Sequence, residues 1–197
     1  MKLADLSVKE FLNSVASKEP TPGGGSVAAL MCANGAALTA MVARLTIGKK
    51  KYAEHEQLMQ DIIIKADELK EKFIEFIDKD ALAYNGVARV FSMPKGDERT
   101  TAMQEALKVA AIVPLEVVEL GLEALKIVES AVGKSNENAS SDLKVAGLSI
   151  ESGIFSACKN VEINLKSIDD INFSVDILYK MGNILNEVYH IINKPRL

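Results

Sequence analysis

Pro22-Gly23-Gly24-Gly25-Ser26 leads directly into Val27-Ala28-Ala29-Leu30, and small residues continue from there to Ala43. Glycine allows close backbone approach, and the first turn of a helix presents unpaired N–H donors with a partial positive charge. The stretch therefore predicts a turn that enters a closely packed helix, with Ser26 as the N-cap. Its N–H groups suit an anionic or carbonyl-rich ligand, whereas the alternative is an ordinary loop before a helix. The spacing matches neither the P-loop nor the dinucleotide-binding fingerprint.

A second segment, Gly147 to Ala157, is equally rich in small residues. Helices of this composition bury little apolar area per residue, so close backbone approach and dispersion must compensate. We expect the two small-residue helices to lie centrally, against each other or across a two-fold axis. Since a monomer of this size can hide only one or two such helices, we expect a homodimer.

Helical periodicity dominates the chain, and no segment reads as a convincing strand. Ser7 and Glu10 form a capping box for a first short helix. Pro114 predicts a kink or a break inside one of the long helices. The sequence indicates a single all-α domain, 1–197, folded as an antiparallel bundle of about six helices, with helices expected near 8–15, 26–47, 54–91, 97–130, 139–165 and 170–190.

Composition excludes several classes of function. The 197 residues are 48% hydrophobic and carry a net charge of −4, which gives no reason to expect nucleic acid or an anionic membrane as a partner. The first residues lack the apolar core of a signal peptide, and no apolar run is expected to span a membrane, so the protein is expected to be cytoplasmic. Cys32 and Cys158 read as buried free thiols. His55 and His190 share no ligand-like spacing, so no metal is expected.

One carboxylate lies where a core residue is expected. At 100° per residue, Asp80 falls on an apolar stripe of the long central helix, and Asp78 points to the opposite side. Burial disfavours the charged form, which raises the pKa of a carboxyl group and suits it to general acid–base chemistry. The alternative is a structural aspartate that caps or pairs with a neighbouring helix. The other members of the stripe are Ile62, Ala66, Leu69, Phe73, Ile77, Tyr84, Val87 and Phe91.

Two polar clusters are further candidates for ligand binding. Lys49, Lys50 and Lys51 form either a solvated turn or an attractive site for a ligand with several carboxylates. A later cluster exceeds what one helix cap requires and consists of Asn136, Asn138, Ser140, Ser141 and Asp142.

Four motifs occur in an order that resembles the cyclodeaminase/cyclohydrolase family. They are the Pro20–Ser26 segment, Lys49-Lys50-Lys51-Tyr52, Asp80-Ala81-x-Ala83-Tyr84 and Asn138-x-x-Ser141-Asp142. The family comprises the C-terminal domain of formiminotransferase-cyclodeaminase and the stand-alone bacterial methenyltetrahydrofolate cyclohydrolases, and the resemblance covers nearly the whole chain. It implies an all-helical homodimer that acts on one-carbon tetrahydrofolates, with Asp80 at the position of the catalytic aspartate.

The resemblance also implies a substrate and a set of contacts. The favoured activity is formiminotetrahydrofolate cyclodeaminase, the close alternative is methenyltetrahydrofolate cyclohydrolase, and a non-catalytic folate-binding dimer is the third reading. The tetrahydrofolate is the substrate, with one or several glutamates, and no metal or redox cofactor is required. The expected substrate contacts are the glycine loop, for the pterin or glutamyl end, the lysine turn, for the carboxylates, and the later polar segment: Pro22, Gly23, Gly24, Gly25, Ser26, Lys49, Lys51, Asn138, Ser141 and Asp142.

Overall fold

The computed structural model describes residues 2–194, and these residues form helices without any strand. The prediction of an all-α bundle of about six helices is confirmed for this part of the chain. Three short 3-10 helices, η1 (Leu3–Asp5), η2 (Lys50–His55) and η3 (Glu137–Ala139), occur between or before the longer elements. The α-helices are α1 (Val8–Val15), α2 (Gly24–Arg44), α3 (Glu56–Phe91), α4 (Asp97–Ala131), α5 (Ser140–Leu165) and α6 (Ile171–Ile192).

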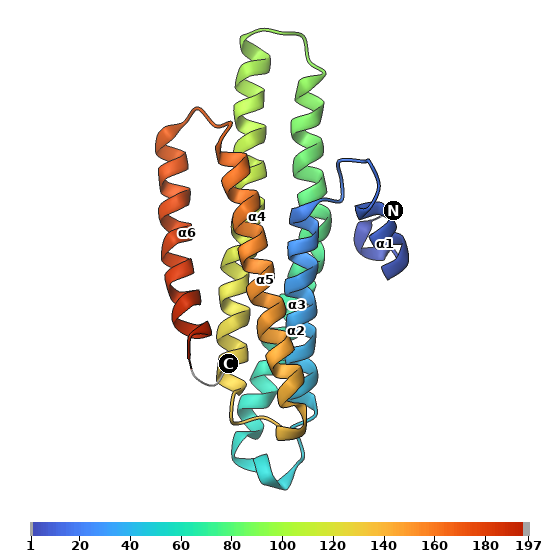
Figure 1. Ribbon diagram of the computed structural model, residues 1–197, viewed down its shortest axis with the longest axis vertical. Helices are drawn as coiled ribbons and strands as arrows, with labels where there is room; N and C mark the ends of the chain where they lie inside the picture. The colour runs from blue at the N-terminus through green and yellow to red at the C-terminus, as the bar shows by residue number, and fades with distance from the viewer. Residues whose placement is uncertain (1, 195–197) are drawn as a thin grey trace.

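The two small-residue helices, α2 and α5, pack directly against each other inside one chain (Figure 1). Gly153 is the clearest contact, because a Cβ there would overlap Cys32 Sγ and lie 2.9 Å from the Ala28 carbonyl oxygen. Gly35 plays the same part further along, against Ile150 and the Ala146 carbonyl. Because these glycines have no side chain, the two backbones approach closely. The two small-residue helices lie against each other, which is the first of the two arrangements expected from the sequence.

α3 and α4 complete a four-helix core with α2 and α5, and α6 lies against α4. The five largest fully buried side chains, Phe73, Met59, Leu125, Ile150 and Ile154, come from α3, α4 and α5, and each contributes about 1.5–3 kcal/mol relative to an exposed position. α2 is long and apolar enough to span a membrane by length and composition, contrary to the sequence expectation, but 61% of that window is buried in the bundle. Such burial fits a core helix.

The hairpin of α3 and α4 extends beyond the ends of α2 and α5, at the top of Figure 1. The predicted apolar stripe of α3 is therefore buried only along its first part. Phe73 and Ile77 are buried, whereas Tyr84 is 45% exposed and Phe91 is 63% exposed. The apolar periodicity correctly predicted the helix, but the prediction that the whole stripe is buried was wrong. Among residues 2–194, no other helix covers this end of the stripe.

Two of the six α-helices, α1 and α6, begin with a side-chain N-cap. Ser7 and Glu10 form the predicted capping box of α1, and the Asp170 side chain accepts the Phe173 N–H at the start of α6. Ser26 is not the N-cap of α2; Gly23 is, and it has no side chain to serve as a cap. Pro114 does not break α4, since the helix is continuous from Asp97 to Ala131.

Both cysteines are free and buried, as expected. Burial raises the pKa of the Cys32 thiol to about 12 and that of Cys158 to about 11. Neither thiol is therefore a nucleophile near neutral pH.

Substituting alanine for Gly153 should destabilise the protein, by about 1–3 kcal/mol, because the added methyl group overpacks the α2–α5 contact. Gly182→Ala is the matched control: it is also helical, a methyl group there would meet no atom within 4 Å, and it should stabilise by about 0.5–1 kcal/mol. Urea denaturation measures both. Equal shifts for the two variants would contradict close packing at Gly153.

Candidate functional site

The first turn of α2 is held by a carboxylate from α3. The Ser26 N–H donates to Asp80 Oδ2 at 2.9 Å, and the Ser26 hydroxyl lies 3.0 Å from the same oxygen. An N-cap side chain usually accepts an N–H of the first turn. Because Gly23 cannot do so, Asp80 supplies that acceptor from another helix. The structural alternative for Asp80, a cap of a neighbouring helix, is thus realised.

Gly25 makes this approach possible. A Cβ at that position would overlap the Asp80 carboxylate, with Cγ only 2.5 Å away. Gly24 is next to Asn160, whose side-chain amide would lie 3.4 Å from an added Cβ. The glycine run therefore brings the start of α2 against both α3 and α5. One N–H of this first turn, that of Ser26, is bonded to Asp80 and is not available to a ligand.

A cavity of about 330 Å³ opens beside this contact, between α2, α3, α4 and α5. Asp80 and the glycine loop form its polar side, together with two amides that the sequence motifs did not include, Asn160 and Asn164. Their spacing of one helical turn was the available signal. Pro22 and Ser26 are buried and do not line the cavity. The remaining lining residues are Pro20, Thr21, Tyr84, Ala83, Val87, Leu107, Ala110 and Ile163.

Asn164 is fixed by the proline of α4. Pro114 has no N–H, so the carbonyl of Ala110, four residues earlier, lacks its usual helical donor. Asn164 Nδ2 donates to that carbonyl at 2.6 Å. The proline thus leaves an acceptor that α5 satisfies, and the pair forms part of the cavity wall.

Asp80 has the electrostatics of a group that can exchange protons. Burial raises the pKa of its carboxyl group, and the two hydrogen bonds from Ser26 oppose that shift. The Ser26 hydroxyl also lies 2.8 Å from the Ile77 carbonyl oxygen. Its single proton can go to Ile77 while a neutral Asp80 donates to Ser26 Oγ, or to an ionised Asp80, so both protonation states find partners. Asp80 Oδ1 accepts no hydrogen bond from residues 2–194, which leaves it for a molecule in the cavity.

Asp78 has a different task. Its carboxylate accepts the Leu3 N–H at 2.7 Å and the Ala4 N–H at 3.4 Å, on the side of α3 away from the cavity. It ties η1 to α3, so Asp78 has a structural role on the face of α3 opposite Asp80.

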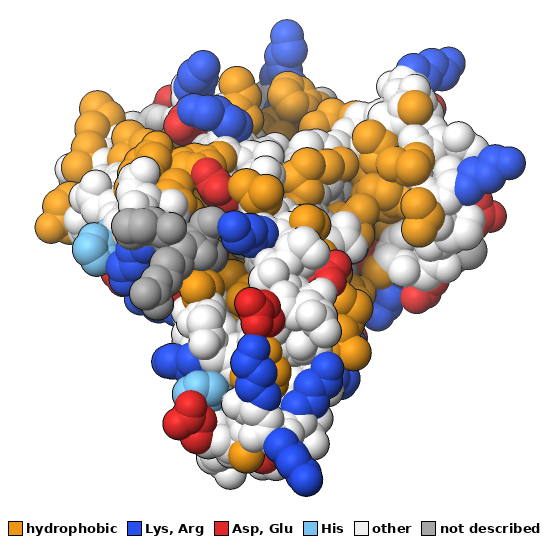
Figure 2. Space-filling view, turned by 60° about the horizontal axis from the view of Figure 1, so that its bottom comes forward, with side chains coloured by type: hydrophobic (Ala, Val, Ile, Leu, Met, Phe, Trp, Pro, Cys, Tyr) orange, Lys and Arg blue, Asp and Glu red, His pale blue; other side chains and the backbone are white. Residues whose placement is uncertain are grey.

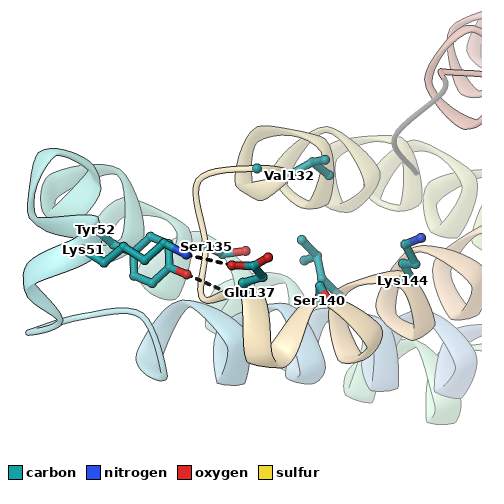
Figure 3. A pocket seen from close by; sticks show the side chains of 9 residues that line it. Lys51, Tyr52, Val132, Ser135, Glu137, Ser140 and Lys144 are labelled. Atoms are coloured by element: carbon teal, nitrogen blue, oxygen red, sulfur yellow. Dashed lines mark hydrogen bonds and ion pairs between the residues drawn. The ribbon is translucent and has the colours of Figure 1, made fainter.

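The predicted lysine turn lies at the other end of the bundle, where Lys and Arg side chains gather at the narrow lower tip in Figure 2. Figure 3 shows Lys51 reaching Glu137, with 2.7 Å between Nζ and Oε2, while Tyr52 Oη accepts the Glu137 N–H at 2.9 Å. The ion pair raises the pKa of Lys51 and lowers that of Glu137. These residues border a second cavity of about 370 Å³ with Ser135, Ser140 and Lys144.

The later polar cluster lies beside this second cavity. Asn136 has a structural role in this cluster as the N-cap of η3. Its N–H donates to Thr46 Oγ1 at 2.8 Å, and its Oδ1 accepts the Asn138 N–H at 3.2 Å. Lys49, Asn138, Ser141 and Asp142 do not line either cavity.

The sequence-predicted site residues therefore separate into two groups. Asp80 lies roughly 35 Å along α3 from its start at Glu56, at a rise of about 1.5 Å per residue. Glycines 23 to 25 line the same cavity as Asp80, whereas the lysine turn and the Asn138–Asp142 segment lie at the opposite end of the helical bundle.

Comparison with known proteins finds relatives with two different names, methenyltetrahydrofolate cyclohydrolase and formimidoyltransferase-cyclodeaminase. The family model described as Formiminotransferase-cyclodeaminase matches residues 7–182. The chain is 38% identical to a methenyltetrahydrofolate cyclohydrolase of Methylorubrum extorquens, over 92% of this chain and 89% of that protein. It is 33% identical to the formimidoyltransferase-cyclodeaminase of Rattus norvegicus, over 94% of this chain but 35% of that longer protein. A crystal structure of formiminotetrahydrofolate cyclodeaminase from Thermotoga maritima matches with a TM-score of 0.90 and 30% identity, covering 96% of this chain and 93% of that one.

Replacing Asn164 with alanine should cost about 1–3 kcal/mol, because the Ala110 carbonyl is left without its donor. The cost should shrink in a Pro114→Ala background, where residue 114 regains an N–H for the same carbonyl. A double-mutant cycle by urea denaturation measures this coupling. Strictly additive effects would show that Pro114 and Asn164 are independent.

Asp80→Asn should gain stability relative to the wild type as pH rises from about 4 to 8. The pKa of Asp80 is raised in the folded state, so its contribution is fully present below the unfolded pKa and is lost as pH rises through the folded pKa. Asparagine keeps an acceptor for Ser26 without the buried charge. Asp176→Asn, at an exposed position of α6, is the control. A difference between Asp80→Asn and wild type that is constant with pH would contradict the raised pKa.

Proposed function

Because the chain belongs to the formiminotransferase-cyclodeaminase family, we propose that it converts 5-formiminotetrahydrofolate into 5,10-methenyltetrahydrofolate and ammonia, with Asp80 as its acid–base group. The observation that carries the proposal is Asp80 itself: a partly buried carboxyl group at the edge of a cavity, with Oδ2 engaged by Ser26 and Oδ1 left unbonded by residues 2–194. The solved structure with the same fold has the cyclodeaminase name and a chain of similar extent.

The reaction needs one proton removed and one delivered. The nitrogen that bears the aminobenzoyl group attacks the formimino carbon, so a carbon–nitrogen bond forms and a tetrahedral intermediate results. Asp80 Oδ1 takes the proton from the attacking nitrogen and gives it to the amino group, which leaves as ammonia when its bond to carbon breaks. A single carboxyl group suffices for both transfers, and the mechanism requires no metal or redox cofactor.

Ser26 supports both halves of this cycle. While Asp80 is ionised, the Ser26 hydroxyl and N–H both donate to Oδ2. While Asp80 holds the proton, the hydroxyl can turn to the Ile77 carbonyl oxygen. The carboxyl group can thus change its charge without leaving a buried polar atom unpaired, which keeps the cost of each proton transfer small.

Methenyltetrahydrofolate cyclohydrolase is the second candidate, and the 38% identical relative of that name favours it. Here water adds to the cyclic amidinium carbon and the ring opens. Asp80 would act as the base toward that water, and its negative charge would stabilise the cationic substrate. Both reactions take place at the same carbon.

One assay separates the two candidates. The purified protein is mixed with 5-formiminotetrahydrofolate or, separately, with 5,10-methenyltetrahydrofolate, and the near-ultraviolet absorbance of the methenyl form is followed. A rise with the first substrate supports the deaminase and a fall with the second supports the hydrolase. No change with either would refute the proposal.

We also propose that the protein works as a homodimer on substrates that can carry several glutamates. The outward faces of α2 and α5 expose Met41, Leu45, Val145, Leu148 and Ile163, an apolar surface suited to a second copy. Lys49, Lys51, Asn138, Ser141 and Asp142 could approach a substrate at Asp80 only from another protomer, given the separation within one chain. Sedimentation equilibrium at micromolar concentration tests the dimer, and a monomer alone would contradict it.

Asp80→Asn should lower kcat by about 10²–10⁴-fold with little change in KM, because it removes the titratable proton and keeps the shape of the side chain. Asp176→Asn is again the matched control and should keep wild-type turnover. Circular dichroism and sedimentation should show an intact fold for both. A fully active Asp80→Asn protein would remove Asp80 from the mechanism.

A further inference from the structure

A larger cavity, of about 650 Å³, adjoins the Asp80 cavity at the projecting end of the α3–α4 hairpin. Val87 and Leu107 line both cavities, so the two share a wall. Nothing in the chemistry proposed for Asp80 uses this second space. Its position on the outer side of the reaction centre raises the question of which part of a ligand it receives.

Two helical rows form the cavity. α3 contributes Val87 and Phe91, one turn apart, and α4 contributes Arg99, Met103 and Leu107 at the same spacing. Val87, Phe91, Met103 and Leu107 give the cavity an apolar side, and Thr100, Gln104 and Ser167 complete its lining with polar groups. Phe91 is 63% exposed, and the Arg99 guanidinium lies 5.7 Å from its ring centroid. The exposed Phe91 ring extends the apolar surface of Val87, Met103 and Leu107, which suits an apolar part of a ligand.

The outer end of the cavity is positive. Lys95 and Arg99 line it, and neither forms an ion pair among residues 2–194. By contrast, Lys51 is paired with Glu137, and Lys108 with Asp170. The acidic neighbours in the first turn of α4, Asp97 and Glu98, do not line the cavity. Two uncommitted cations at the end of an apolar groove complement a ligand that carries carboxylates.

We propose that this cavity binds the p-aminobenzoyl-glutamate part of the tetrahydrofolate, with the aromatic ring beside Val87 and Leu107 and the glutamate carboxylates at Arg99 and Lys95. The assignment rests on the proposed function, since it takes the reacting carbon to lie at Asp80. It names a tail-binding site formed by α3 and α4, separate from the lysine turn at the other end of the chain.

The dimensions agree. At a rise of about 1.5 Å per residue, Val87 lies about 10 Å and Phe91 about 16 Å along α3 from Asp80. In the substrate, the aminobenzoyl ring and the amide place the glutamate carboxylates roughly 10–13 Å from the attacking nitrogen, at about 1.3–1.5 Å per bond. The ring then lies beside Val87 and Leu107, and the carboxylates come within reach of the two cations.

The test is direct binding of p-aminobenzoyl-glutamate and p-aminobenzoyl-triglutamate by titration calorimetry, together with steady-state kinetics. The variant Lys95→Gln/Arg99→Gln should bind both fragments about tenfold or more weakly at low salt, because charge-assisted hydrogen bonds are lost. The defect should shrink as salt rises. In kinetics the same variant should raise KM and leave kcat near the wild-type value, since the cations contact the tail and not the reacting atoms.

Two comparisons make the result specific. Lys65→Gln/Lys72→Gln removes the same charge from exposed positions of α3 and should bind both fragments as the wild type does. p-Aminobenzamide, which keeps the aminobenzoyl ring but carries no carboxylate, should bind wild type and Lys95→Gln/Arg99→Gln equally. Lys49→Gln/Lys50→Gln/Lys51→Gln shows how much the distant turn contributes.

The outcomes are distinguishable. Wild-type affinity for both fragments in Lys95→Gln/Arg99→Gln, no binding by the wild type at millimolar concentration, or equal losses in the Lys65→Gln/Lys72→Gln variant would each overturn the tail-binding site, even if turnover at Asp80 is observed. Absence of turnover with either folate, combined with loss of fragment binding in the Lys95→Gln/Arg99→Gln variant alone, would refute the proposed reaction and leave the binding site standing.

Discussion

The contact between the Asp80 carboxylate and the first turn of α2 is the constraint on which the site depends. α2 begins at glycines and has no cap of its own, so its free N–H groups require an acceptor from elsewhere. α3 supplies that acceptor through Asp80, and Gly25 leaves the space for it. The contact fixes where α2 starts relative to α3, and through the close α2–α5 packing it also positions Asn160 and Asn164 of α5 around the cavity.

One carboxyl group therefore serves both the fold and the proposed chemistry. Oδ2 is committed to Ser26, while Oδ1 has no hydrogen-bond partner among residues 2–194, and Asp80 lines the cavity. The structural and catalytic interpretations of a buried aspartate are usually treated as alternatives. Here the first supports the second, because the hydrogen bonds to Ser26 hold the side chain in one orientation while burial keeps its pKa above the ordinary value. Preorganisation of this kind is what a proton-transferring group requires.

Local signals in the sequence were sufficient for the helices and for the prominence of Asp80. The capping box of Ser7 is local, and it was predicted. Ser26 was misplaced because the cap of α2 comes from another helix, which no local pattern reveals. Asn164 was missed for the same reason: its partner is a carbonyl left free by Pro114, far away in sequence. The distance between the lysine turn and Asp80 is likewise a property of long straight helices, and motif order along the chain does not indicate it.

The burial of Cys32 beneath Gly153 makes the α2–α5 seam observable in solution. Its thiol is fully buried against Gly153, and with a pKa of about 12 it is almost entirely protonated near neutral pH. A thiol reagent can reach the sulfur only when the two helices separate, so the rate of its modification counts opening events of the bundle core. Cys32 is thus an intrinsic probe of local opening between α2 and α5, the two helices that contribute the glycines and the asparagines to the wall of the Asp80 cavity.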